Sequence, residues 1–269
     1  MMAQNINWRT LMKDTHKIFG LVAWASLATL SFTSTVVAVD FEDVKAKLEL
    51  ALQAEGRPDA DKDRDRNRRP IDTLEFFGLR DDMKVVELIP GGGWYTRLLA
   101  PVLAEHGEFY IAYGTSRVAA KFEDLPGFEK LKVTAEGVKM GRPEGAKYYE
   151  AKETGLGLTD VDMVFTFRNY HNFDAASRDA INNSVFVALK SGGVYALVDH
   201  TRRHMQKDDN ENGRRVDPVL AIKEIEAAGF VFVDYSDLHY RADDELIYEV
   251  GRKTVKGNTD RWTLKFRKP

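Results

Sequence analysis

Three glycines directly follow an apolar run in the stretch "LIPGGGWYT", residues 88–96. A glycine has no Cβ, so the backbone of Gly91, Gly92 and Gly93 can approach a ligand that other residues would repel. Glu87 stands just before this loop, where a carboxylate can orient a hydroxyl-bearing or positively charged ligand. A helix that begins directly after the loop would add free N–H donors. The pattern predicts a loop that holds a nucleotide-like ligand, although a tight turn alone would also favour glycine.

A second polar group stands in "TFRNYHN", residues 166–172, after another apolar run. Arg168, Asn169 and His171 are expected at the same carboxyl edge of the sheet as the glycine loop, where wound sheets bind ligands. A histidine with a near-neutral pKa suits proton removal, so His171 is a candidate base and Asn169 a candidate catalytic residue. The alternative is that these side chains cap the next helix and satisfy loop carbonyls.

A third group stands in "VDHTRRH", residues 198–204. His200 is the second candidate base, and a purely structural hydrogen bond is its alternative. Asp199 and His204 could join the two histidines in a metal site, but their spacing matches no compact ligand signature, so no metal is expected. The polar loop that follows is long enough to act as a lid. Its arginines, Arg214 and Arg215, are predicted to contact substrate, and an anionic substrate would suit them.

Alternating strand-like and helix-like segments position these groups. They predict an α/β fold, a Rossmann-like seven-stranded, mostly parallel sheet with helices on both faces and a C-terminal antiparallel strand pair. Asp217 and Pro218 indicate an N-cap and first residue of a late helix. The third strand has only a weak candidate, "KYYEA", residues 147–151. The expected strands are 83–89, 108–113, 161–167 and 194–200, with 230–240 and 261–269 as the closing pair.

The N-terminal forty residues have the composition of an export signal. Basic residues up to Lys17 precede the apolar run Ile18–Leu30, and Ala38 closes a small-residue cleavage site. Residues 1–38 are therefore expected to be a signal peptide and the protein to be periplasmic or otherwise extracytoplasmic. The alternative is an uncleaved anchor, because residues 18–39 carry no charge and are long enough to span a bilayer.

The overall composition limits what the remainder can be. The chain has 269 residues, 43% of them hydrophobic, which suffices for one substantial core. It has no cysteine, which excludes disulfides and thiolate chemistry, and its formal net charge of −3 gives no electrostatic case for nucleic acid. Residues 39–80 are expected to form a helical extension, whose charge run at 57–70 reads as a solvated helix, and residues 81–269 the main domain.

From Arg57 to its C-terminus, the chain resembles the class I S-adenosylmethionine-dependent methyltransferases. Their first motif is E/D-x-G-x-G-x-G; Glu87, Gly91 and Gly93 match it, and Ile89 replaces the first glycine. The chain looks closest to a group of predicted, signal-peptide-bearing bacterial methyltransferases. That group shows "PGGGWYT", "TFRNxHN", a closing "DRxTLxFxKP" and a spaced Arg/Asp segment, and this chain has "PGGGWYT", "TFRNYHN", "DRWTLKFRKP" and the segment at 57–70.

The resemblance implies an exported methyltransferase that uses S-adenosylmethionine and acts on a small molecule or envelope component. Membrane contact is expected only through an uncleaved N-terminus. Tyr113 replaces the usual ribose-binding acid, and Glu150 and Glu153 are candidates for the adenine-side acid. The alternatives are a non-catalytic ligand-binding protein on this fold and an enzyme that uses another nucleotide. The cofactor-binding residues implied are Glu87, Pro90, Gly91, Gly92, Gly93, Tyr95, Thr96, Tyr113 and Arg168.

Overall fold

A computed structural model describes residues 41–122 and 125–269. The predicted signal peptide or anchor, residues 1–38, lies outside this part of the chain. Among the described residues, no helix has the length and apolar character that a membrane crossing requires.

A seven-stranded sheet forms the centre of the described chain and confirms the predicted fold class. Its strand order is β3-β2-β1-β6-β7-β9-β8. Every neighbouring pair from β3 to β7 is parallel, and β9 runs antiparallel to both β7 and β8. The strands are β1 (Lys84–Leu88), β2 (Glu108–Ala112), β3 (Leu131–Thr134), β6 (Val161–Phe167), β7 (Leu189–His200), β8 (Val231–Ser236) and β9 (Arg261–Arg267).

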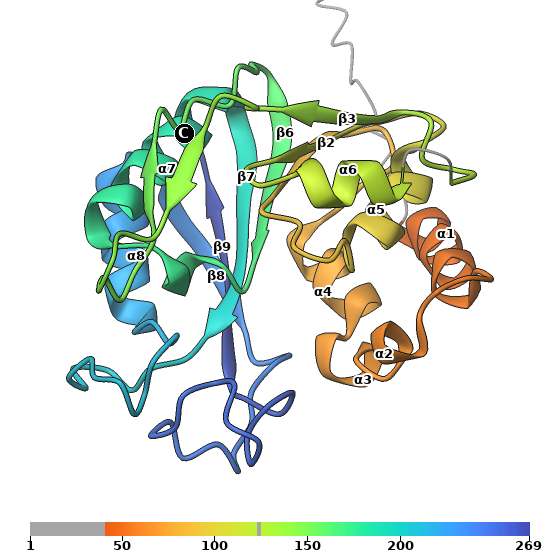
Figure 1. Ribbon diagram of the computed structural model, residues 1–269. Helices are drawn as coiled ribbons and strands as arrows, with labels where there is room; N and C mark the ends of the chain where they lie inside the picture. The colour runs from red at the N-terminus through yellow and green to blue at the C-terminus, as the bar shows by residue number, and fades with distance from the viewer. Residues whose placement is uncertain (1–40, 123–124) are drawn as a thin grey trace, which may run out of the picture. The chain divides into compact units, whose positions relative to one another are not determined.

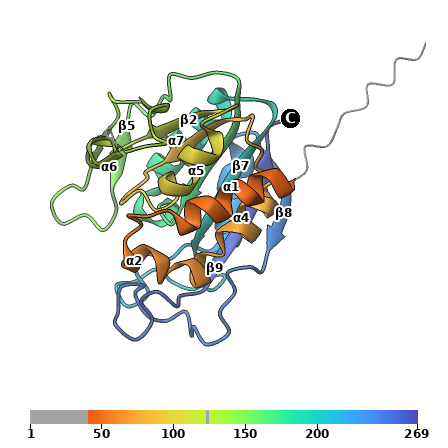
Figure 2. The ribbon, with the colours of Figure 1, turned by 90° about the vertical axis from the view of Figure 1, so that its right-hand side faces the viewer.

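Helices cover both faces of this sheet, because successive residues of a strand point to opposite sides. Val85 and Met163 pack under one set of helices, whereas Val86 and Val164 pack under the other. The two sets lie on opposite sides of the strands in Figure 1, and Figure 2 shows the first set in front. The first set is α1 (Phe41–Gln53), α4 (Pro70–Phe77), α5 (Thr96–Leu103) and α6 (Ser116–Phe122); the second is α7 (Ala175–Ala188) and α8 (Pro218–Ala227).

The late helix α8 begins as its sequence predicts. The side chain of Asp217 accepts a hydrogen bond from the Val219 N–H at 2.9 Å, and Pro218 is the first helical residue. Because this cap fixes the start of α8, it also fixes the end of the long loop that joins α8 to β7.

The candidate for the third strand was wrong. "KYYEA" contributes to β5 (Glu150–Lys152), which pairs with β4 (Lys139–Gly141) in a separate two-stranded sheet. The third strand of the main sheet is β3, a short edge strand whose residues are only partly buried, so its apolar pattern is weak. Glu150 and Glu153 therefore do not end the third strand; they pair with the nearby lysines Lys152 and Lys139.

The charge run at residues 57–70 is not one solvated helix. It forms two single-turn helices, α2 (Asp59–Lys62) and α3 (Asp65–Arg68), and a left-handed Arg69 (φ 40°) ends the second. The Trp94 indole donates to the Asp61 carbonyl at 2.9 Å, and the Arg68 guanidinium lies 4.3 Å from the centre of the Trp94 ring. These contacts fold the charged segment against the glycine loop, so part of it is buried.

Candidate active site

The three glycines of the loop after β1 differ in the space around each missing Cβ. A Cβ at Gly93 would lie 2.3 Å from a ring carbon of Phe122, so this glycine permits the packing of α6 against the loop. A Cβ at Gly91 or Gly92 would meet no atom within 4 Å. The N–H groups of Gly91 and Gly92 also make no hydrogen bond within the described chain. The first two glycines are therefore open to a ligand, and the third is required for packing.

Glu87 lies beneath this loop, at the end of β1. It is buried, and the Thr96 hydroxyl donates to its carboxylate at 2.6 Å. Burial raises the pKa of Glu87 to about 7, and the Thr96 hydrogen bond and the nearby Arg68 only partly oppose this shift. Glu87 and Thr96 thus form a buried polar pair between the end of β1 and the start of α5.

A cavity of about 280 Å³ opens between the glycine loop, the end of β6 and the α2–α3 segment. This volume is close to the lower limit of ligand pockets in proteins, about 300 Å³. Tyr95, one of its lining residues, stacks on Phe167 with ring centres 3.5 Å apart. The glycine-loop cavity, as we call it, is lined by Ala60, Asp61, Arg64, Arg68, Glu87, Ile89, Pro90, Gly91, Gly92, Trp94, Tyr95, Phe167, Arg168 and Asn169.

Most of the residues predicted to bind the cofactor line this cavity or support it. Glu87, Pro90, Gly91, Gly92 and Tyr95 line it, as does Arg168, while Thr96 and Gly93 lie just behind. Sequence reasoning missed Arg64 and Arg68 as lining residues. The signal that could have found them was the spaced Arg/Asp segment, which was interpreted as a solvated helix.

Asn169, a predicted catalytic residue, holds the backbone of the site together. Its amide donates at 3.0 Å to the carbonyl of Ile89 in the glycine loop and to the carbonyl of Phe167 at the end of β6. Ile89 itself is left-handed (φ 52°), an unusual backbone for a β-branched residue, and its N–H donates to Ala112. Asn169 therefore fixes the shape of the loop, which is a positioning role.

His171 and Asp199 form a buried pair. The carboxylate of Asp199 accepts from His171 Nδ1 at 2.5 Å and from the backbone N–H groups of His171 and His200 at 2.9 and 2.6 Å. Because a carboxylate only accepts, Nδ1 carries the hydrogen and Nε2 of a neutral ring carries the lone pair. Nε2 has no hydrogen-bond partner among the described residues. His171 thus has the arrangement of a general base oriented by an acid.

A second cavity, of about 230 Å³, lies beside His171. We call it the histidine cavity. It shares no lining residue with the glycine-loop cavity: Asn169 lines that cavity, and His171, two residues later, lines this one. It is mainly polar and aromatic. Its lining residues are Arg142, Lys147, Tyr148, Tyr149, His171, Asn172, Asn210, Gly213, Arg214 and Glu249.

His200, the other candidate base, is in a different environment. Its ring is buried, lines none of the cavities described above, and shares a 2.8 Å hydrogen bond between Nδ1 and the Thr259 hydroxyl. Burial, and next the neighbouring His171 ring 5.4 Å away, hold the pKa of His200 well below its ordinary value. Of the two predicted bases, the geometry favours His171, and we assign His200 a structural hydrogen bond.

Tyr113 follows β2, at the position where related folds use an acid, but its side chain does not face the glycine-loop cavity. It is 1% exposed, packs in the core on the α7 side of the sheet, and donates its hydroxyl to the Thr154 carbonyl. The prediction that Tyr113 contacts the cofactor therefore has no support in the geometry. The physical reason is that the core encloses its ring and the Thr154 carbonyl occupies its hydroxyl.

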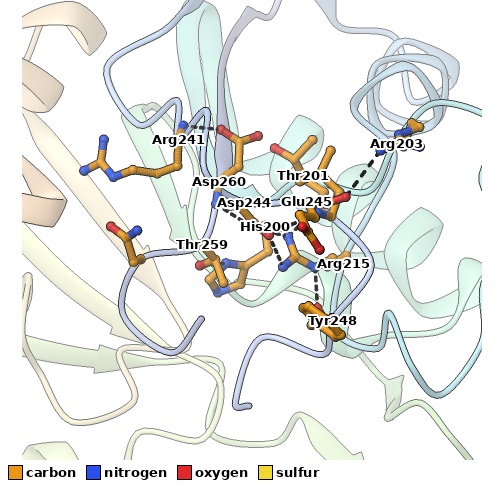
Figure 3. Close-up of polar contacts among 12 residues, drawn as sticks. His200, Thr201, Arg203, Arg215, Arg241, Asp244, Glu245, Tyr248, Thr259 and Asp260 are labelled. Atoms are coloured by element: carbon orange, nitrogen blue, oxygen red, sulfur yellow. Dashed lines mark hydrogen bonds and ion pairs between the residues drawn. The ribbon is translucent and has the colours of Figure 1, made fainter. Parts of the chain in front are cut away.

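The two arginines predicted to contact substrate differ from each other. Arg215 is 2% exposed, and its guanidinium pairs with Asp244 at 2.8 and 2.9 Å and donates to the carbonyls of Thr201 and Tyr248. Figure 3 shows it enclosed by these partners. Arg215 therefore stabilises the loops. Arg214 is half-exposed, pairs with Glu249 and lines the histidine cavity.

The histidines and acids do not form a metal site in the described part of the chain. No group of three or more potential ligand side chains gathers there closely enough to hold an ion. His204 instead pairs with the helix cap Asp217 at 2.9 Å.

Comparisons with solved structures identify the same fold in other proteins. A SAM-dependent methyltransferase from Aquifex aeolicus is 16% identical over 79% of this chain and 98% of that chain, with a TM-score of 0.53. The cyclase SpnF is 14% identical over 85% of this chain and 94% of that chain, with a TM-score of 0.53. Human N-acetylserotonin methyltransferase was solved in complex with SAM. It is 12% identical over 85% of this chain and 57% of that chain, with a TM-score of 0.51.

These likenesses concern the fold, and a cyclase among them shows that the fold alone does not fix the reaction. No family model matches the chain, and no curated protein sequence matches it. The sheet order, the antiparallel β9 and the glycine loop after β1 together give the chain the Rossmann-like fold of the SAM-dependent methyltransferases.

Proposed function

We propose that the protein is an S-adenosylmethionine-dependent methyltransferase that acts on a small molecule or an envelope component. The observation that carries the proposal is the open glycine loop at the carboxyl end of β1. Among the described residues, the N–H groups of Gly91 and Gly92 have no hydrogen-bond partner, and they lie beside a cavity that the buried acid Glu87 also lines. In wound α/β sheets this edge is where ligands bind.

The residues present fit one part of this cofactor well. The free amides of Gly91 and Gly92 and the carboxylate of Glu87 suit a group that carries both a carboxylate and an ammonium, such as the amino-acid end of S-adenosylmethionine. Tyr95 and Trp94 add aromatic surface to the same cavity. When bound, the cofactor would supply an electrophilic methyl group on a positively charged sulfur.

His171 is the group we assign to proton removal from the acceptor. Asp199 fixes its tautomer, and Nε2 has no partner among the described residues where His171 lines the histidine cavity. Transfer of a methyl group to oxygen or nitrogen is easier when the acceptor has lost its proton. A base in this position contributes about 10²- to 10⁴-fold to the rate of such steps.

The reaction itself can be tested with methyl-labelled S-adenosylmethionine and an extract of small molecules and envelope material. We expect label in an acceptor with the wild-type chain. His171→Gln should lower kcat by about 100-fold or more with little change in cofactor binding. His204→Gln, a half-exposed histidine paired with Asp217, is the matched control and should leave kcat unchanged. Equal rates for wild type and His171→Gln would overturn the assignment of the base.

One observation favours a second function, a non-catalytic protein that binds a small ligand in the same cleft. Tyr113 occupies the position of the ribose-binding acid, and its hydroxyl is already used by the Thr154 carbonyl. A site without that acid lacks a usual bidentate acceptor for the ribose. Tight binding of S-adenosylhomocysteine without transfer to any acceptor would support this second function.

We further propose that the protein works outside the cytoplasm. This proposal rests on the basic, apolar and small-residue regions of residues 1–38, which lie outside the described part of the chain. The intact mass of the protein recovered from cell fractions tests it. A chain beginning at Val39 in the periplasmic fraction is expected; a full-length chain confined to the cytoplasmic fraction would contradict it.

A further inference from the structure

Four arginines converge beside the glycine-loop cavity, and none of them has an acidic partner among the described residues. Arg64, Arg68 and Arg168 line the cavity, and Arg261 lies behind them, where its Nη1 donates to the Asn67 carbonyl at 2.9 Å. We call these four residues the arginine cluster. Other arginines of the described chain, such as Arg57, Arg178 and Arg215, have carboxylate partners within 2.9 Å.

Part of the cluster is buried. Arg68 and Arg261 are 6% and 4% exposed, whereas Arg64 and Arg168 are partly exposed at the cavity. Among the described residues, the buried Nε atoms of Arg68, Arg168 and Arg261 have no hydrogen-bond partner.

Arg57, Arg97 and Arg202 also have an unsatisfied buried Nε, but each of them pairs with a carboxylate. The cluster differs because its members have both unsatisfied donors and no carboxylate partner among the described residues. Positively charged donors that face one cavity in this way suit an anion.

The electrostatics agree with this geometry. Burial, and next the guanidinium of Arg168, lower the pKa of Arg68 to about 8. Burial and the same neighbour lower the pKa of Arg261 to about 9. The facing acids pair elsewhere or are only partly ionised. The pKa of Glu87 is raised to about 7, and Asp199 already binds His171 and two backbone N–H groups. Asp61, which also lines the cavity, pairs with Arg97 at 3.8 Å. An arginine stays protonated in proteins, so a bound anion would relieve the repulsion.

We propose that the arginine cluster binds the oxyanion of the acceptor molecule, a doubly charged group such as a phosphate monoester. This inference rests on the proposed function and names the class of its substrate. S-adenosylmethionine carries a carboxylate, an ammonium and a sulfonium, so its net charge is +1 and it adds to the positive charge of the cleft. We place its one carboxylate at the amides of Gly91 and Gly92, so the cofactor offers the four guanidinium groups no second anion. Guanidinium groups bind phosphate through paired, charge-assisted hydrogen bonds.

Titration of the full chain with inorganic phosphate and with phenyl phosphate, followed by calorimetry, tests the site without the cofactor. Both anions should bind, and Arg168→Gln and Arg64→Gln should each weaken binding by about 10-fold or more. Arg66→Gln is the matched control, an exposed arginine of the same segment, and should change the affinity less than two-fold. Arg68 is kept because it packs on Trp94. Circular dichroism and thermal melting check that each variant is folded.

Titrations with S-adenosylhomocysteine and its decarboxylated analogue distinguish the two sources of an anion. If the cluster serves the acceptor, Arg64→Gln should weaken phosphate binding and leave the affinity for both nucleosides within about three-fold of wild type. If Arg64→Gln weakens only the carboxylated nucleoside and phosphate competes with it, the cluster binds the cofactor's own carboxylate and the inference is overturned. An absence of phosphate binding also overturns it, even if S-adenosylhomocysteine binds and the proposed function stands. Phosphate binding without nucleoside binding would overturn the proposed function and leave an anion site.

Discussion

Two sets of buried arginines lie near the carboxyl edge of the sheet, and they differ in what neutralises their charge. Arg215 has a carboxylate, two carbonyls and almost no exposure to solvent. Arg68 is also buried and Arg168 is partly buried, yet no acid pairs with them among the described residues. A buried charge is tolerated only with a partner. The first set is therefore complete within the protein, and we infer that the second is completed by a ligand.

The contrast predicts opposite effects of removing an arginine, and the largest is expected at Arg215. Arg215→Met leaves Asp244 as a buried, unpaired charge, so it should lower the free energy of unfolding by about 3–5 kcal/mol. Urea denaturation measures this loss. The control is Arg214→Met, which removes a half-exposed ion pair with Glu249 and should cost less than about 1 kcal/mol. A loss below 1 kcal/mol at Arg215 would remove the distinction between the two sets.

Glu87, the acid beside Arg68 and Arg168, gives the second prediction: the free energy of unfolding depends on pH. The pKa of Glu87 is about 7 in the folded chain, whereas its ordinary value is 4.5. Between pH 4.5 and pH 7, the folded chain therefore keeps a proton on Glu87 that the unfolded chain has lost. Stability should therefore fall as the pH rises from 4.5 to 7, by about 3 kcal/mol, and level off above 7.

The control for this prediction is Glu87→Gln, which cannot titrate. The difference in unfolding free energy between wild type and this variant, measured from pH 4 to pH 8, isolates the contribution of Glu87. A difference that does not change across this window, or one that favours the wild type as the pH rises, would contradict the raised pKa.

The third and smallest effect concerns the unpaired arginines themselves. Arg168→Gln removes one of several neighbouring positive charges, so without added anions it should raise the free energy of unfolding by about 1 kcal/mol. Arg168→Lys keeps the charge and should show little of this gain. Thermal or urea unfolding at low ionic strength measures both variants. A clear loss of stability in Arg168→Gln would mean that the protein already satisfies this side chain.

The sequence was sufficient for the fold because its strongest patterns are local. Continuous apolar strands such as Val161–Phe167 and capped helices such as Pro218–Ala227 are determined by neighbouring residues. The edge strand Leu131–Thr134 was missed because only one of its sides pairs and its residues are only partly buried.

The site was harder to predict from the sequence than the fold, because its contacts join residues far apart in the chain. The position of Gly91 and Gly92 could be predicted from the strand before them. The pairing of Arg215 with Asp244 spans 29 residues, and the approach of Arg68 to Trp94 depends on how an irregular charged segment folds back. No local periodicity encodes either contact. From the sequence, Arg215 was therefore predicted to contact substrate and Arg68 to lie in a solvated helix.

The most direct test of the account is a calorimetric titration of the purified chain with S-adenosylhomocysteine, performed on wild type and on Gly92→Val. Gly92 has no left-handed backbone and an open space around its missing Cβ, so valine should obstruct the ligand and leave the fold intact. Gly155→Ala is the control, because Gly155 also has open space around its missing Cβ and lines neither cavity. The account predicts saturable binding to wild type and to the control, and a loss of about 10-fold or more in Gly92→Val. No binding by folded wild-type protein, or equal binding by Gly92→Val, would contradict it.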